Sequence, residues 1–378
     1  MREPTCPYFA LPDTGFRGKC GGCVTQHIPY EVQIENKKNR AVQVLKFDDV
    51  QVFSGEEFYY RNRMDMVFAE EGIGFRQKKS WRWRVAIRQC AISNARLNEL
   101  IKEMWEHFED VDDFEPKEHT GTYRYAVIRT PQNDSCISFV LNKDSSKCGE
   151  AIERIEDFAK KTTSNNILVT YMPAKTDMSY GEEFIVIKGS DILEETLMGR
   201  TFRYSAQGFF QNNTEMAERM HEYVHGLLKS YDKSEYAHLL DLYGGVGTFG
   251  VINADLFKSV MTVEAYEGCT VAAKANIELN GIENCEAINM DAKQVSQLNL
   301  SKGPLYVVTD PPRSGMHPKT IEGLVKAKPE VIIYISCNIK QLEKDMPKFL
   351  KHYKLKSAAI FDLFPQTNHM ETVVELVK

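Results

Sequence analysis

Three reactive side chains lie next to apolar segments near the C-terminus. Cys337 directly follows the apolar segment 331–336, Asp310 directly follows the apolar segment 305–309, and Glu371 opens a final apolar stretch. The two segments have the pattern of buried strands, and open α/β sheets carry their reactive groups at the carboxyl ends of such strands. A thiol close to carboxylates predicts nucleophilic chemistry.

A glycine-rich turn at 241–250 follows an earlier apolar segment. Glycine lets the backbone approach a ligand closely, and a helix is expected to begin in this turn. Glu264 ends the next strand, where an acid takes both ribose hydroxyls, and Asp291 follows the third strand, where it is expected to hold an adenine amino group. The dinucleotide pattern GxGxxG is not met and no phosphate-binding lysine is present. S-adenosylmethionine, which carries no phosphate, therefore fits better than NAD, and a thiol beside it predicts covalent group transfer.

This set of groups suits methylation of uracil at C5. Uracil becomes nucleophilic at C5 only after a thiolate adds to C6 and produces an enolate. C5 then takes the methyl group, and a base must remove the C5 proton. We expect Cys337 to be the nucleophile and Glu371 the base. A free cysteine titrates near about 8.5, so we expect the site to lower the pKa of Cys337.

Four of the nine cysteines lie in the first 90 residues, at Cys6, Cys20, Cys23 and Cys90. The Cys-Gly-Gly-Cys pair lets the backbone fold tightly around a metal centre, and four thiolates suit either tetrahedral zinc or a cubane iron–sulfur cluster. Zinc ribbons usually contain two CxxC pairs, whereas here one pair joins two single cysteines. The spacing favours a [4Fe-4S] cluster, which is structural because four protein ligands leave no open iron site.

Length and composition indicate a protein with two or three domains and ample buried cores, since the chain has 378 residues of which 43% are hydrophobic. No apolar run of about 18 or more residues occurs, and the N-terminus has no apolar signal region. An odd number of cysteines without a secretory signal argues against a disulfide framework. We therefore expect a soluble, cytoplasmic protein with no membrane partner.

The net charge of −6 by itself argues against a polyanionic partner, but the charge is unevenly distributed. Residues 58–90 hold eight basic and three acidic residues, with aromatic residues interleaved. Such a mixture is what a single-stranded nucleic-acid surface requires, although an ordinary solvated hairpin can contain it too.

Three regions follow from composition: 1–90 with the cysteines and the basic-aromatic segment, 91–200 as a central α+β domain that binds RNA, and 201–378 as the catalytic domain. The third region alternates strands with helical patterns, which predicts a parallel sheet with helices on both faces. The predicted fold class is α/β, with a Rossmann-like methyltransferase domain at the C-terminus, an N-terminal iron–sulfur region and a central α+β domain. The strands expected in the third region are 239–242, 259–264, 285–289, 305–309 and 331–336.

The chain resembles the RNA 5-methyluridine methyltransferase family, which forms C5-methyluridine in tRNA and in large-subunit rRNA. The resemblance covers nearly the whole chain and rests on the four cysteines, the glycine turn and the segments 209–213, 310–315, 336–338, 364–365 and 369–371. It implies a structural [4Fe-4S] cluster on the four cysteines, with Cys337 as nucleophile and Glu371 as base. It also implies that S-adenosylmethionine is held by Gln211, Tyr243, Thr248, Glu264, Asp291 and Asp310.

The chain departs from the family pattern in two places. Many members carry an N-terminal β-barrel module called TRAM before the cysteines, whereas Cys6 here is almost the first residue. We therefore expect an archaeal-like member without TRAM, whose RNA is held by the basic-aromatic region and the central domain, with Arg124 and Arg129 as candidates. Gly244 stands where a cysteine is common in relatives, and little consequence is expected because the backbone makes the contacts.

The leading hypothesis is a monomeric, S-adenosylmethionine-dependent RNA uridine-C5 methyltransferase without an obligate protein partner. The T-loop uridine of tRNA is the favoured target because residues 60–65 look like archaeal members, and a uridine of 23S rRNA is the alternative. A non-catalytic, cluster-containing RNA-binding or redox-sensing protein is disfavoured because Cys337, Glu371 and Asp310 are all present. An amino-group methyltransferase is disfavoured because Arg313 stands where an aromatic residue usually follows Asp-Pro-Pro.

Overall fold

Continuous apolar segments in the C-terminal half form the centre of an eight-stranded sheet. Every residue of β14 and of β15 is buried, as expected for parallel strands covered on both faces. The strand order is β1-β16-β17-β15-β14-β11-β12-β13. Strands β11 to β15 are parallel to their neighbours within this set, whereas β17 is antiparallel to both β15 and β16. The strands are β1 (Val50–Phe53), β11 (His238–Leu242), β12 (Ser259–Glu264), β13 (Cys285–Asn289), β14 (Leu305–Thr309), β15 (Val331–Ser336), β16 (Lys354–Phe361) and β17 (Glu371–Val377).

Helices cover both faces of this sheet. Buried side chains of α1, α7 and α8 pack against one face in a single apolar cluster, and those of α4 and α5 pack against the other. The prediction of a parallel sheet with helices on both faces is confirmed for β11 to β15. The helices of this half are α1 (Tyr30–Leu45), α4 (Thr214–Lys229), α5 (Thr248–Asn253), α6 (Glu267–Leu279), α7 (Pro318–Ala327) and α8 (Ile339–Phe349), with short 3-10 helices at Ser234–Tyr236, Ala254–Leu256 and Ala292–Gln297.

A seven-stranded sheet of order β4-β3-β2-β5-β6-β7-β8 forms the second half of the molecule. Helix α2 begins at the cap residue Asn94, whose side chain accepts a hydrogen bond from the N–H of Leu97 at 2.8 Å. Helices α2 and α3 bury their apolar stripes against this sheet. The elements are β2 (Arg63–Ala69), β3 (Gly72–Arg76), β4 (Arg84–Ala86), α2 (Ala95–His107), β5 (Tyr123–Arg129), β6 (Cys136–Asn142), α3 (Cys148–Lys161), β7 (Asn166–Met172) and β8 (Phe184–Lys188).

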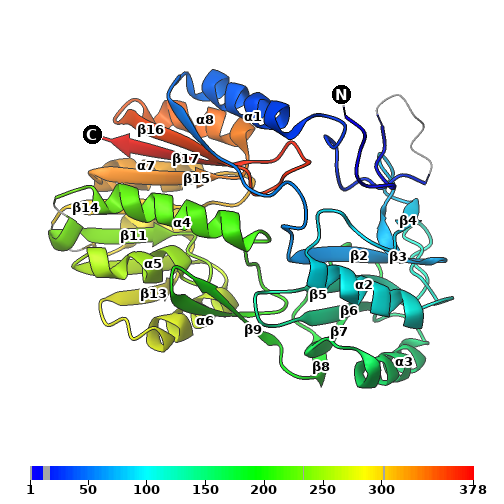
Figure 1. Cartoon of the computed structure of the whole chain (residues 1–378). Helices are drawn as coiled ribbons and strands as arrows, with labels where there is room; N and C mark the ends of the chain where they lie inside the picture. Colours follow the sequence, from blue (N-terminus) through cyan, green and yellow to red (C-terminus); the bar gives the residue numbers. More distant parts are fainter. Residues whose placement is uncertain (1, 12–17, 233, 301–302) are drawn as a thin grey trace.

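Figure 1 shows the two sheets in separate halves of the computed structural model, with the N-terminal arm (2–11 and 18–29) next to the seven-stranded half. Residues 2–11, 18–232, 234–300 and 303–378 are described. A two-stranded ribbon, β9 (Ile192–Leu197) and β10 (Arg200–Ser205), leads from the seven-stranded half toward α4. Within the described ranges, no helix is both long and apolar enough to cross a membrane.

Residues 1–90, which were expected to form one region, are divided between the two halves by the strand pairing. Strand β1 pairs with β16 in the eight-stranded sheet, whereas β2, β3 and β4 belong to the seven-stranded sheet. Helix α1 packs with α8 on the eight-stranded half. The chain thus passes from the eight-stranded half to the seven-stranded half within the first region, because β1 pairs with a strand far away in sequence.

Candidate active site

Cys337 and Glu371 are neighbours at one edge of the eight-stranded sheet. Ser336 at the end of β15 pairs with Thr372 of β17, so the residue after Ser336 lies beside the residue before Thr372 in this antiparallel ladder. Glu371 is only 4% exposed, and its Oε2 atom has no hydrogen-bond partner among the described residues. Buried polar atoms without a partner are rare in folded proteins and call for a functional explanation.

Arg313 joins the loops that surround this pair. The side chain of Asn338 donates a hydrogen bond from Nδ2 to the carbonyl oxygen of Arg313 at 2.9 Å, which ties the loop after β15 to the loop after β14. The guanidinium of Arg313 lies 3.4 Å from Nδ1 of His369, in the loop before β17. No catalytic role was predicted for Arg313 or His369, although an arginine directly after Asp-Pro-Pro and a histidine two positions before Glu371 were visible signals.

The two carboxyl groups of the site hold protons more tightly than free carboxyl groups do. Burial raises the pKa of Glu371 well above its ordinary value, Asp310 raises it further, and Arg313 opposes the shift. Burial also raises the pKa of Asp310, with a smaller contribution from Asp241. A carboxylate with a raised pKa is a stronger base once it is ionised.

The pKa of the Cys337 thiol is also shifted, in the direction opposite to the one expected. Burial, together with the charges of Glu371 and Asp310, raises the pKa of Cys337 to about 12, while Arg313 acts to lower it. The expectation that the site lowers this pKa is wrong for the protein alone, because burial of the thiol and the two carboxyl groups beside it raise the pKa more than Arg313 lowers it.

The glycine-rich turn between β11 and α5 is held against the end of β12. Glu264 accepts hydrogen bonds from the N–H of Gly245 at 3.1 Å and from the N–H of Tyr266 at 2.8 Å. A Cβ atom on Gly244 would lie 2.2 Å from Cγ2 of Thr262, so the glycine at this position is required by packing and is not a neutral departure. A Cβ atom on Gly245 would meet nothing within 4 Å, so the turn faces open space there.

Five of the six residues predicted to hold the cofactor gather at the carboxyl ends of adjacent strands. Tyr243, with a positive φ of 59°, directly follows β11, Thr248 begins α5, and Glu264 ends β12. Asp291 follows β13 and accepts a hydrogen bond from the N–H of Lys293, and Asp310 follows β14. These ends are neighbours because the strand order there is β14-β11-β12-β13.

The sixth of these residues, Gln211, lies on the connection before α4. Its carbonyl oxygen accepts a hydrogen bond from Nδ2 of Asn62 at 3.4 Å, and the N–H of Asn62 donates to the carbonyl oxygen of Asn212 at 2.9 Å. Gln211 is therefore anchored where the two halves of the molecule meet.

Cys6, Cys20, Cys23 and Cys90 all line one cavity of about 600 Å³ and are free thiols. The N–H of Gly22 donates a hydrogen bond to Sγ of Cys20 at 3.3 Å. In the described part of the chain, no group of three or more histidine, cysteine, aspartate or glutamate side chains has an arrangement that could hold a metal ion. The structure thus brings the four thiols to one cavity without closing them around a single ion.

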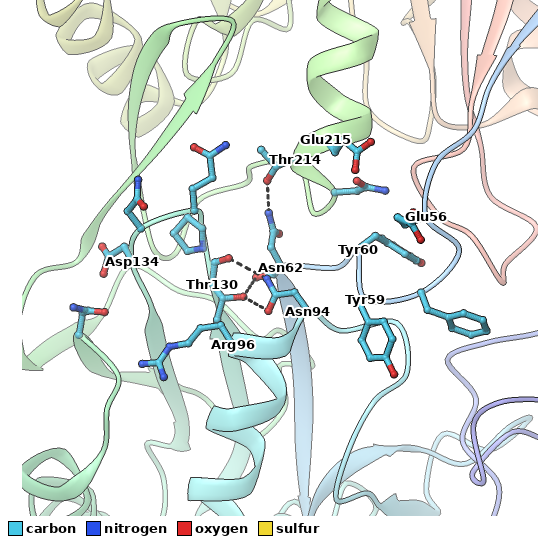
Figure 2. Close-up of a pocket in the computed structure, with 16 residues that line it drawn as sticks. Glu56, Tyr59, Tyr60, Asn62, Asn94, Arg96, Thr130, Asp134, Thr214 and Glu215 are labelled. Atoms are coloured by element: carbon cyan, nitrogen blue, oxygen red, sulfur yellow. Dashed lines mark hydrogen bonds between the residues drawn. The ribbon is translucent and has the colours of Figure 1, made fainter.

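A second cavity, of about 690 Å³, lies on the other side of the segment 59–63 (Figure 2). Tyr60 and Asn62 line this second cavity, whereas Arg61 and Arg63 line the cysteine cavity, so the segment separates the two spaces. Figure 2 shows the hydrogen bond from Nδ2 of Asn62 to Oγ1 of Thr214, at 2.9 Å, which closes one wall. None of the predicted catalytic, cofactor or metal residues lines the second cavity.

Acidic side chains from elsewhere in the chain neutralise much of the basic-aromatic region. The guanidinium of Arg84 pairs with Asp113 at 2.6 Å, and that of Arg76 pairs with Asp177 at 2.7 Å. Trp81 and Trp83 remain 58% and 61% exposed. The local charge excess counted along the sequence therefore overstates the charge of the folded surface, while the stacking rings stay accessible.

Arg124 and Arg129 are not surface residues, which corrects their expected role in RNA binding. They are 5% and 3% exposed, and their guanidinium groups donate hydrogen bonds to the backbone carbonyls of Thr176 and Gly208. Both arginines satisfy backbone acceptors inside the protein, so they are structural.

A family model described as tRNA (Uracil-5-)-methyltransferase matches residues 29–378 of the chain. The tRNA (uracil(54)-C(5))-methyltransferase of Pyrococcus abyssi is 30% identical over 367 residues, which covers 95% of this chain and 84% of that protein. An uncharacterised RNA methyltransferase of Caldanaerobacter subterraneus is also 30% identical and covers 100% of this chain and 85% of the relative.

One solved structure is similar over nearly the full length. The crystal structure of the Pyrococcus abyssi tRNA (uracil-54, C5)-methyltransferase in complex with S-adenosyl-L-homocysteine superposes with a TM-score of 0.78 at 28% identity. The match covers 95% of this chain and 86% of that one. The two-halved arrangement is therefore shared with this enzyme.

Proposed function

The chain belongs to the tRNA (uracil-5-)-methyltransferase family, and on that premise we propose that it methylates C5 of uridine 54 in tRNA with S-adenosylmethionine as methyl donor. The choice of uridine 54 rests on the Pyrococcus relatives, which are tRNA (uracil(54)-C(5))-methyltransferases. The observation that carries the proposal is the juxtaposition of the Cys337 thiol and the Glu371 carboxyl group, with Asp310 acting on both.

The proposed reaction begins when the thiolate of Cys337 adds to C6 of the uracil. The electron pair of the C5–C6 double bond moves toward C5 and O4, so C5 becomes nucleophilic. C5 would take the methyl group as the bond from the methyl carbon to the sulfonium sulfur breaks, leaving S-adenosylhomocysteine, and the carboxylate of Glu371 then removes the C5 proton. The pair from the C5–H bond restores the double bond and expels the thiolate of Cys337, while the proton on Glu371 leaves to solvent.

These reaction steps need both Cys337 and Glu371 in their ionised forms. The protein without ligands disfavours those forms, because it raises the pKa of both groups. Arg313 is the nearby group that lowers the pKa of both. No salt bridge to Arg313 occurs among the described residues, so its charge is not neutralised by a carboxylate partner. We propose that Arg313 stabilises the thiolate and the enolate by its charge, as cationic groups do for developing anions.

S-adenosylmethionine, when bound, supplies an electrophilic methyl group on a sulfonium. The strand ends suit it, because Gly245 faces open space and the phosphate-binding residues of a dinucleotide site are missing. We propose that Glu264 accepts hydrogen bonds from the ribose hydroxyls and that Asp291 accepts one from the adenine amino group. Tyr243, Thr248, Gln211 and Asp310 complete the proposed binding set.

We also propose a structural [4Fe-4S] cluster on Cys6, Cys20, Cys23 and Cys90. The donor set fits such a cluster: four thiols share one cavity, and the N–H of Gly22 is directed at Sγ of Cys20, as N–H groups are at cluster sulfurs. A four-iron cubane is wider than one ion, so its ligands stand further apart than those of a mononuclear site. The cluster would cross-link the N-terminal arm to the start of α2.

We propose that RNA binds along the rim of the cysteine cavity, beside the proposed cluster. Arg61, Arg63, Tyr180 and Phe209 line it, and Tyr180 and Phe209 are exposed aromatic rings. Aromatic stacking and arginine contacts are the usual means of holding unstacked bases. The seven-stranded half, with Trp81 and Trp83 at its edge, is the proposed RNA-binding domain.

The function is tested by mapping 5-methyluridine. Unmodified tRNA and 23S rRNA are incubated with S-adenosylmethionine and either the wild type or Cys337→Ala, and nuclease digests are analysed by mass spectrometry. The wild type is expected to form 5-methyluridine at position 54 of tRNA and Cys337→Ala none. Methylation of 23S rRNA alone, or no methylation of either RNA, would contradict the proposal.

A further inference from the structure

The loop 362–370, which connects β16 to β17, carries His369 and ends at Glu371. Hairpin connections are usually about two to five residues long, so this loop is longer than most and its shape must be held by contacts with other segments. Phe361 pairs with Glu371 across the two strands, so the loop closes directly onto the proposed base. Contacts that hold this loop in its shape therefore also hold the carboxyl group of Glu371 in position.

Gln366 lies at the centre of the loop and is fully buried, with a positive φ of 67°. Its backbone carbonyl accepts hydrogen bonds from the N–H groups of Val24 at 2.9 Å and Thr25 at 3.2 Å, the two residues that follow Cys23. A non-glycine residue with positive φ is uncommon and persists where its surroundings hold it in place. The backbone of the loop is thus held by the arm that bears the thiols.

The side chain of Gln366 makes hydrogen bonds to three further residues. Its Oε1 accepts hydrogen bonds from Nε2 of Gln33 in α1 at 3.0 Å and from the guanidinium of Arg2 at 3.4 Å. Its Nε2 donates to Oε2 of Glu57 at 2.9 Å. Arg2 in turn forms a bidentate pair with Glu57, at 2.9 and 2.6 Å.

The same network reaches the cysteines through Gln26. The N–H of Cys6 donates a hydrogen bond to Oε1 of Gln26 at 3.1 Å, and Nε of Arg2 donates to the carbonyl oxygen of Gln26 at 2.9 Å. Figure 1 shows the loop before β17 extending toward the N-terminal arm. An unbroken chain of hydrogen bonds therefore runs from Cys6 through Gln26 and Arg2 to Gln366.

We infer that Gln366 is a positioning residue that transfers the folded state of the cysteine-bearing arm to the loop holding Glu371. The inference rests on the proposed function, because it assigns Glu371 to removal of the C5 proton. Its consequence is selective. Thiolate addition by Cys337, which directly follows β15, should not depend on Gln366, whereas proton removal and product release should.

The test uses Gln366→Asn, which tolerates a positive φ but is too short to reach Gln33, Arg2 and Glu57 together. Gln294→Asn, at an exposed glutamine of the same half, is the matched control. Two rates are measured with the full-length protein: formation of a denaturation-resistant adduct with RNA containing 5-fluorouridine, which needs no proton removal, and release of methylated product from ordinary RNA.

Gln366→Asn should form the fluorouridine adduct within about twofold of the wild-type rate. It should release product roughly 10- to 100-fold more slowly, because a small misplacement of a catalytic group costs about that much, and a methylated covalent complex should accumulate on ordinary RNA. Gln294→Asn should match the wild type in both assays.

Arg2→Met should give the same selective defect, and combining it with Gln366→Asn should add less than the product of the two effects, as expected for residues in one network. Equal loss of both rates in Gln366→Asn would overturn the inference in favour of a general structural role, and no loss of either rate would overturn it outright. Failure of the wild type itself to form the adduct would instead refute the proposed function and this inference with it.

Discussion

The buried ion pair between Lys37 and Asp362 offers a test of how α1 supports the catalytic half. Nζ of Lys37 lies 2.6 Å from Oδ1 of Asp362, and the two side chains are 7% and 1% exposed. Asp362 also accepts a hydrogen bond from the hydroxyl of Tyr30 at 3.0 Å and is the first residue of the loop that leads to Glu371. Lys37→Met would leave the carboxylate of Asp362 buried with only that hydroxyl as a side-chain partner.

The magnitude follows from the burial of the pair. Removing one partner of a buried salt bridge costs about 3 to 5 kcal/mol, because the other charge stays buried and unpaired. With an unfolding entropy of about 2.1 cal/mol/K per residue, a 378-residue chain that unfolds as one unit loses about 4 to 6 °C in Tm. If the methyltransferase half unfolds separately, its unfolding entropy is smaller, so the same loss of stability lowers Tm by more.

Thermal unfolding followed by circular dichroism measures this shift, with Lys38→Met as the matched control. Lys38 has no salt bridge in the described part of the chain, so its substitution should change Tm by less than about 1 °C, as surface substitutions do. The double variant Lys37→Met/Asp362→Leu should recover most of the loss, since an apolar pair of similar volume replaces an ion pair at little cost. Equal Tm values for Lys37→Met and Lys38→Met would refute the reasoning.

Four further predictions concern the chemistry and the cysteines. Glu371→Gln should accumulate a methylated, denaturation-resistant RNA complex, and normal product release would identify another base. Folding raises the pKa of Glu371, so the folded state loses stability as the pH rises above about 4.3, the pKa of this side chain in the unfolded chain. Glu371→Gln removes this loss and should therefore raise Tm at pH 8 but not at pH 4. The ionised forms of Cys337 and Glu371 react, and folding raises both pKa values, so kcat/KM should keep rising with pH beyond about 8.5, the pKa of a free cysteine. Arg313→Gln should move this pH profile to higher pH. A kcat/KM that does not change with pH would contradict the prediction. Protein purified without oxygen should contain about four irons per chain, and Cys20→Ser should lose iron and stability together, whereas stoichiometric zinc would refute the cluster.

The catalytic sheet was predictable because its strands are continuous apolar segments. Four of the five expected strands, at 259–264, 285–289, 305–309 and 331–336, match the observed bounds, and the fifth differs by one residue at its start. Pairing between distant segments was not predictable in the same way. Nothing in the local pattern of 50–53 indicates that it joins the sheet beside β16.

The chemistry of the candidate site was only partly visible in the sequence. Residue types and strand ends identify Cys337, Asp310 and Glu371, but the shift of the Cys337 pKa depends on which charges face the thiol in the folded chain. The same limit applies to Arg84, whose partner Asp113 lies in a distant segment of the sequence. Burial and partners of charged groups are set by tertiary packing, which composition does not reveal.

The central claim is that the Cys337 thiolate bonds to C6 of the target uridine. It is tested most directly by incubating the enzyme with S-adenosylmethionine and tRNA containing 5-fluorouridine, followed by denaturing electrophoresis and peptide mass spectrometry. A covalent RNA adduct is expected on Cys337 and should be absent from Cys337→Ala. An adduct on another residue, or an active Cys337→Ala enzyme that forms 5-methyluridine, would contradict it.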